Sequence, residues 1–235
     1  MSKALYLDDS YLKEFEAKVV SVKDGKYVVL DKTVFYPNSG GQPYDAGVFI
    51  RKSDNKEFKV VYVGKFSGEI SHEIGGDGLM VGDDIIGRID WDRRYKLMRM
   101  HTACHVLAGI IHKETGAMIT GNQLDIEKSR IDFSLENFNK EEMANYIQKS
   151  NEIIAKNLGI KVYYLDKNQN AEEFLKLAKG LPPDLERIRI VEIEDFDKQP
   201  DGGTHVKNTS EIGNLELIKC DNKGANFRRV YFRLV

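Results

Sequence analysis

Residues 91–116 have the sequence WDRRYKLMRMHTACHVLAGIIHKETG. Apolar residues recur there at steps of three and four, no proline interrupts them, and Gly116 is a residue type that often ends helices. The pattern predicts one long amphipathic helix from Trp91 to about Thr115. His101 and His105 lie four residues apart, so both imidazoles are expected on one helix face, within reach of a single metal ion.

Between Ala17 and about Asp90, short apolar or alternating runs are separated by turn residues such as Asp24-Gly25 and the glycine-rich stretch 75–78. This pattern predicts a small all-β unit, a sandwich or a barrel. Its expected strands are 18–22, 27–30, 58–63 and 85–89.

Strand and helix patterns mix after the long helix. Asn139 followed by Glu142 is typical of a capping box, which predicts a second helix that Gly159 ends. A sheet packed on helices in an α+β fold follows from this order. The other expected elements are a short helix at 172–179, strands at 130–134, 160–165 and 188–193, and two strands flanking a turn at 221–224.

Composition restricts the class of protein. The formal net charge is −2, which does not fit a strongly basic nucleic-acid coat, and no run of about 18 apolar residues could span a bilayer. The N-terminus lacks the apolar stretch of a signal peptide, and Cys104 and Cys220 form no disulfide framework. We expect a cytoplasmic protein with neither a membrane nor DNA as its partner.

Two segments, 88–99 and 219–233, are nevertheless locally basic. Such clusters are common on solvated surfaces, but they could also contact the phosphates of a nucleic acid. The candidates for phosphate contacts are Arg93, Arg94, Lys96, Arg228 and Arg229.

A second pair of metal-ligand types supplements the helix histidines. The helix pair alone could arise by chance, and it lacks the glutamate of HExxH, which disfavours a metalloprotease. Asp201 and His205 again lie four residues apart, in a loop with two glycines. Together, His101, His105, Asp201 and His205 would form a nitrogen and oxygen site suited to zinc. Alternatively, Asp201 only shapes the turn.

Four motifs in this order resemble the freestanding alanyl-tRNA editing proteins, called AlaX, which are similar to the editing domain of alanyl-tRNA synthetase. The motifs are TVFYPNSGGQ at 33–42, WDRR at 91–94 leading to HTACH at 101–105, RIDFS at 130–134, and GGTHV at 202–206. The resemblance implies a small β-barrel-like subdomain at 1–90 and a two-layer α/β editing core at 91–235 that contains the metal-bearing helix. It further implies one Zn²⁺ and hydrolysis of serine or glycine wrongly attached to the acceptor end of alanine tRNA.

One residue departs from the family pattern, because many relatives have cysteine where this chain has Asp201. Cys104, three residues after His101, is therefore an alternative thiolate ligand. It could equally be a small buried core residue.

The resemblance also implies roles outside the metal site. Gln42 would position the ester or its attacking water, while Ser39, Gly40 and Gly41 would bring backbone N–H groups close to the substrate. Thr33 would sense the hydroxyl of serine. Without the resemblance, Gly40-Gly41 is an ordinary turn and Thr33 an ordinary strand residue.

Several alternatives remain open from the sequence. The metal could activate water, polarise the ester carbonyl, or orient the amino group of the substrate. A different class of protein would be a non-catalytic zinc-containing module that binds tRNA or a synthetase. A third possibility is a corrector of the threonine family, which shares the two helix histidines, although the Ser-Gly-Gly-Gln motif resembles the alanyl branch.

Overall fold

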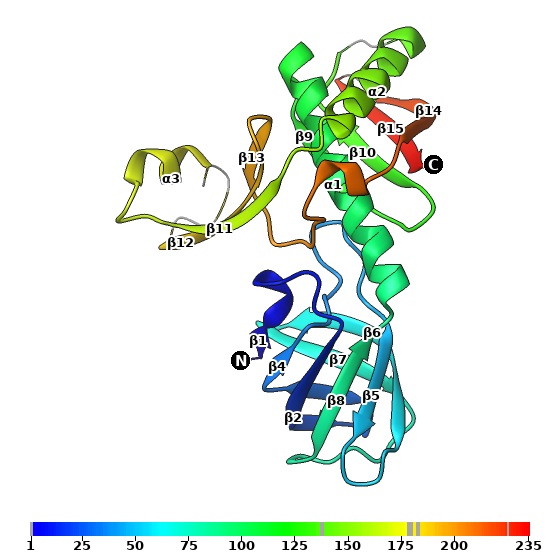
Figure 1. The fold of residues 1–235 in the computed structure, drawn as a ribbon, viewed down its shortest axis with the longest axis vertical. Helices are drawn as coiled ribbons and strands as arrows, with labels where there is room; N and C mark the ends of the chain where they lie inside the picture. Colours follow the sequence, from blue (N-terminus) through cyan, green and yellow to red (C-terminus); the bar gives the residue numbers. More distant parts are fainter. Residues whose placement is uncertain (1, 137–138, 178–180, 182–183, 225) are drawn as a thin grey trace. The chain divides into compact units, whose positions relative to one another are not determined.

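The computed structural model describes residues 2–136, 139–177, 181, 184–224 and 226–235 (Figure 1). The chain divides into two compact units. The first contains Met1–Met98 and Gln123–Ile126, and the second contains Arg99–Asn122 and Glu127–Val235. No helix in the described residues has the length and hydropathy needed to cross a membrane.

The first unit is a closed barrel in which strands pair in the order β2-β3-β7-β6-β5-β8 (Figure 1). Inward and outward side chains alternate, as β2 illustrates: Phe15, Ala17 and Val19 are buried and the residues between them are exposed. The all-β prediction is confirmed, and β5 and β7 complete the barrel beyond the four expected strands. The strand bounds are β2 Glu14–Lys23, β3 Tyr27–Leu30, β5 Gly47–Arg51, β6 Glu57–Phe66, β7 Glu69–Gly75 and β8 Asp84–Ile89.

Short elements precede and accompany the barrel. The strand β1 (Lys3–Ala4) pairs in parallel with β4 (Lys32–Thr33), and the 3-10 helix η1 (Leu5–Leu7) follows β1.

Helix α1 extends from Trp91 to Thr115, as its periodicity predicts, and Gly116 follows with φ at +73°. Its amphipathic character is not confirmed along its whole length. Residues 100–111 are buried without interruption, so the middle of the helix is covered on all sides. The histidine motif therefore lies in the protein interior and not on a solvent-exposed face of the helix.

The second unit has two antiparallel sheets. One has the order β14-β15-β10-β9 and the other β11-β12-β13 (Figure 1). This mixture of helices and sheets confirms the α+β class. The strand bounds are β9 Ile119–Gln123, β10 Ser129–Phe133, β11 Ile160–Asp166, β12 Arg187–Ile193, β13 Asp197–Pro200, β14 Leu215–Gly224 and β15 Phe227–Leu234, and a 3-10 helix, η2, covers Thr209–Glu211.

Helix α2 (Lys140–Ala155) begins with the predicted capping box, because the Asn139 side chain accepts from the backbone of Glu142 and the Glu142 carboxylate accepts from the backbone of Asn139. Its predicted end was wrong. The helix stops at Ala155, and Asn157 takes the left-handed conformation, with φ at +57°, that we expected a glycine to provide further along.

Two other predicted boundaries concern α3 and β14. Helix α3 covers Ala171–Leu177, and the predicted end at residue 179 lies outside the described residues. The predicted turn at 221–224 is wrong, because those residues continue β14, and β15 begins at Phe227. Asp221 and Asn222 are turn-forming types, but they pair with Arg229 and Arg228 of β15.

Candidate metal centre

Helix α1 supplies two imidazoles one turn apart. His101 and His105 are both buried, and their ring centroids are 5.3 Å apart. This is the arrangement expected of residues i and i+4 on one helix face.

The loop after β13 brings a third imidazole to the same place. The His205 ring lies 4.4 Å from the ring of His101 and 4.8 Å from that of His105, measured between centroids. Distant segments of the chain therefore converge on one point within the second unit.

The carboxylate of Asp201 is the common neighbour of the three rings. Its Oδ2 lies 3.4 Å from Nε2 of His101 and 3.6 Å from Nε2 of His105, and its Oδ1 lies 3.2 Å from Nε2 of His205. One ligand atom from each of the four residues lies within 4.8 Å of the others. The structure thus brings together the four side chains selected from the sequence.

The donor set fits a divalent metal ion. Three imidazole nitrogens and one carboxylate oxygen, buried and close together, match the ligands that zinc takes in tetrahedral sites. Two of the rings also have a hydrogen-bond partner at Nδ1, the nitrogen other than the one that faces Asp201. Nδ1 of His105 lies 3.2 Å from Oδ2 of Asp197, and Nδ1 of His205 lies 3.2 Å from Oγ1 of Thr102. Such contacts would leave Nε2 to face a metal ion.

Burial and mutual contact shift the pKa values of these groups. Burial, followed by the charge of His101, lowers the pKa of His205 to about 3. For His105, burial favours the neutral ring, but the bonds to Asp197 and Asp201 outweigh it and raise the pKa to about 9. Burial also opposes ionisation of Asp201, yet the three histidines hold its pKa well below the usual range. The carboxylate is therefore ionised at neutral pH, and metal binding at His105 would displace a proton.

Cys104 does not join this group of ligands. Its thiol is buried, and burial, with added repulsion from Asp201 and Asp197, raises its pKa to about 12. Among the described residues, the side chains whose ligand atoms lie within 4.8 Å of one another are His101, His105, Asp201 and His205, without Cys104. Of the two candidates for the fourth ligand, the geometry favours Asp201.

The Ser39–Gln42 segment is a tight loop of the first unit. Ser39 and Gln42 exchange backbone hydrogen bonds of 3.1 and 2.9 Å, and Gly40 and Gly41 between them have φ values of +57° and +83°. The left-handed backbone explains the paired glycines. The loop is exposed from Ser39 to Gly41, whereas the Gln42 side chain is buried.

Thr33 is a buried residue of the first unit. Its side chain is fully buried, and its Oγ1 accepts from the backbone N–H of Phe35 and lies 2.9 Å from Nε2 of His72. The hydroxyl therefore has partners inside the barrel unit, and the role of Thr33 in sensing the serine hydroxyl stays a prediction.

Two of the five arginine and lysine candidates for tRNA contacts are buried. Arg94 is fully buried, and its guanidinium bonds to the carboxylate of Asp45. Arg228 is 7% exposed and donates to the Asn222 side chain and to backbone carbonyls, including that of Gly224. Both were wrong as phosphate contacts, because their donors are used internally.

The other three candidates retain exposed surface. Lys96 is exposed. Arg93 is half-buried, with its guanidinium over the ring of Tyr44, and Arg229 forms a two-point pair with Asp132, its Nε 2.7 Å from Oδ1. These three remain candidates for contacts to phosphate.

Sequence reasoning missed Asp197 and Thr102. Thr102 lies inside the histidine motif, so its place next to a ligand could have been suspected. Asp197 has no such signal, since it lies far along the chain from His105 and its contact depends on β13.

Comparison with known protein families places this site in context. Residues 188–231 match a family described as the threonyl and alanyl tRNA synthetase second additional domain, and residues 5–93 match one described as tRNA synthetases class II (A). The first match includes Asp201 and His205.

Individual relatives match all or nearly all of this chain. An alanyl-tRNA editing protein AlaX-M of Methanosarcina mazei is 52% identical, covering 100% of this chain and 97% of the relative. One of Saccharolobus solfataricus with the same name is 43% identical, covering 99% and 98%. An alanine–tRNA ligase of Pyrobaculum aerophilum is 40% identical over 94% of this chain, which corresponds to 25% of the ligase.

Proposed function

The chain belongs to the family of alanyl-tRNA editing proteins AlaX-M, and from this premise we propose that it hydrolyses the ester of alanine tRNA wrongly charged with serine or glycine. The observation that carries the proposal is the buried group of His101, His105, Asp201 and His205. A full-length relationship to editing proteins and a metal-ligand set inside the fold both favour a hydrolase.

We propose that these four residues hold one zinc ion. When bound, zinc supplies Lewis-acid chemistry, which polarises a carbonyl oxygen or lowers the pKa of a water molecule. The protein contributes an ionised carboxylate at Asp201 and three rings whose Nε2 atoms face it. Burial excludes bulk water, which strengthens every electrostatic interaction there.

The Ser39–Gln42 loop is proposed to contribute to substrate binding. Its two glycines allow a close approach of backbone to a ligand, and its first three residues are exposed. We keep Gln42 as the residue that positions the ester or the water, because its amide can both donate and accept a hydrogen bond. In this proposal residues 1–90 form the accessory subdomain and residues 91–235 the editing domain.

Contacts to the tRNA acceptor stem are assigned to Arg93, Lys96 and Arg229. Phosphate contacts of this kind position a nucleic acid without selecting its sequence.

A separate editing site has a clear physical reason. A pocket for alanine excludes the smaller glycine poorly, and a hydrophobic pocket rejects an added hydroxyl by only about a hundredfold. A second site that hydrolyses the wrong esters corrects this error.

One experiment tests the proposal directly. Purified protein is incubated with seryl, glycyl and alanyl esters of alanine tRNA, with and without a chelator, and loss of ester is measured. We expect hydrolysis of the seryl or glycyl ester, sparing of the alanyl ester, and loss of activity on chelation. Tight tRNA binding with no loss of any ester would support the alternative, a non-catalytic zinc-containing module.

A further inference from the structure

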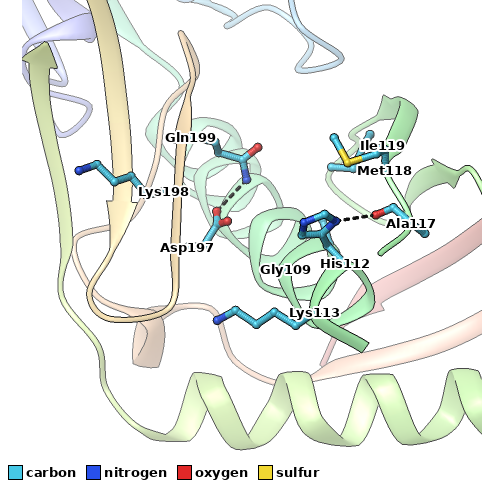
Figure 2. Close-up of a pocket in the computed structure, with 10 residues that line it drawn as sticks. Gly109, His112, Lys113, Ala117, Met118, Ile119, Asp197, Lys198 and Gln199 are labelled. Carbon is cyan, nitrogen blue, oxygen red and sulfur yellow. Dashed lines mark hydrogen bonds between the residues drawn. The ribbon is translucent and has the colours of Figure 1, made fainter. Parts of the chain in front are cut away.

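Asp197 lies directly behind one of the candidate metal ligands. It is the first residue of β13, and its Oδ2 is 3.2 Å from Nδ1 of His105. The amide Nε2 of Gln199 donates to the same oxygen at 2.7 Å, and Figure 2 shows this bond beside helix α1. The carboxylate therefore joins Gln199 on one side to His105 on the other.

This contact determines which nitrogen of His105 carries hydrogen. Metal binding requires the neutral ring, and because an ionised carboxylate only accepts hydrogen bonds, the remaining proton then lies on Nδ1, the nitrogen that faces Asp197. In that neutral form the opposite nitrogen, Nε2, offers its lone pair on the side that faces Asp201, 3.6 Å away. A ring held in this tautomer is ready to bind an ion through Nε2.

Strand pairing sets the backbone positions of Asp197 and Gln199. Asp197 pairs with Ile193 and Gln199 with Val191 across the β12–β13 ladder. Residues two apart on a strand point to the same face, so Gln199 is placed where it can hold the Asp197 carboxylate. The same strand leads directly into the loop that carries Asp201 and His205.

Gln199 also affects the contact of the Asp197 carboxylate with water. Asp197 and Gln199 line a cavity of about 380 Å³ together with Ala108, Gly109 and His112 of α1 (Figure 2). Water entering this cavity would compete for the carboxylate, whose side chain is 17% exposed. A fixed amide donor keeps the carboxylate turned toward His105.

We propose that Asp197 is a positioning residue that fixes the orientation and tautomer of His105 for metal binding, and that Gln199 holds Asp197 in place. The inference rests on the proposed metal centre and adds two residues to it. It also separates the roles of two nearby carboxylates: Asp201 contacts the ion, and Asp197 acts through the ring of His105.

Four full-length variants test this role: Asp197→Ala, Asp197→Asn, Gln199→Met and, as a control, Asp166→Asn. Asp166 lies on β11 and pairs with Arg187, so its replacement removes the same charge from the second unit without contact to the cluster. Zinc affinity is measured by competition with a chelator, and the absorption spectrum of the Co²⁺-loaded protein reports ligand geometry.

Asp197→Ala is expected to weaken zinc binding by about 10–100-fold, which is the usual scale for removing a partner of a metal-bound histidine. It should also alter the Co²⁺ spectrum. Asp197→Asn retains an oxygen that accepts from Nδ1–H, so its loss should be smaller. Gln199→Met should change both readouts in the same direction as Asp197→Ala, and Asp166→Asn should match the wild type. A purely structural role would lower stability in urea but leave the affinity and spectrum of the folded protein unchanged.

The outcomes separate this inference from the proposed function. Wild-type protein that binds no zinc would overturn both. Wild-type binding with unchanged affinity and spectrum in Asp197→Ala would overturn only the role of Asp197. If Asp197→Ala does not fold, Asp197→Asn and Gln199→Met decide, and wild-type behaviour of both would reject the inference.

Discussion

A Cβ atom on Gly203 would lie 2.2 Å from Cε1 of His101 and 2.4 Å from its Nδ1. The loop backbone therefore packs directly on this ring, and any side chain at residue 203 would have to displace it. The adjacent Gly202 is different, because among the described residues its added Cβ would meet no atom within 4 Å.

We predict that Gly203→Ala weakens zinc binding by about 10-fold or more, a scale typical of disturbing the orientation of a ligand. Gly202→Ala is the matched control and should bind zinc like the wild type. Zinc titration against a chelator compares the two. Equal affinities for both variants would show that the packing of residue 203 on His101 does not matter for the site.

The fourth metal ligand is tested by removing each candidate. Asp201→Ala should lose bound zinc, because it deletes the carboxylate next to all three rings. Cys104→Ala should retain it, since the group of neighbouring ligand atoms among the described residues does not include this thiol. Zinc content after dialysis, measured by elemental analysis, decides between them. Loss of metal from the Cys104 variant alone would contradict the assignment.

The Arg94–Asp45 pair is predicted to stabilise the barrel unit. Both side chains are fully buried, so Arg94→Met leaves a buried carboxylate without its cation, which costs about 3–5 kcal/mol. Arg88→Met is the control, because Arg88 pairs with Glu14 at the surface, where loss of a pair costs at most about 1 kcal/mol. Urea unfolding followed by fluorescence of Trp91, the one tryptophan of the chain, measures both. Similar losses in the two variants would contradict the prediction.

The stability of the barrel unit should also depend on pH through His72. Burial lowers the pKa of this ring from 6.5 to about 4, so below pH 6.5 the unfolded chain binds a proton that the folded chain does not. The contribution of the neutral His72 ring to the free energy of unfolding is then fully present above pH 6.5 and decreases as the pH falls toward 4. Between pH 7.5 and pH 5 the contribution of His72 amounts to about 2 kcal/mol.

The measurement for His72 compares urea unfolding at these two pH values in the wild type and in His72→Gln. Other groups also titrate in this range, so the quantity of interest is the difference between the two proteins. We expect the variant to lose the part of the pH dependence that His72 provides. If both proteins show the same pH dependence, that dependence comes from residues other than His72.

The sequence by itself determined the elements that depend on near neighbours. The bounds of α1 follow from apolar periodicity and Gly116, the start of α2 from Asn139 and Glu142, and the proximity of His101 to His105 from their spacing on one helix. Each of these is an interaction within a turn or two of the chain, which residue types alone encode.

Only the tertiary structure decided which distant residues meet. Lys96 and Arg94 look alike in a basic segment, but Arg94 is buried because Asp45 lies opposite it. Asp197 becomes a partner of His105 only through the pairing of β13 with β12. The physical reason is that burying a charge requires a compensating partner, and the chain brings that partner close only when it folds.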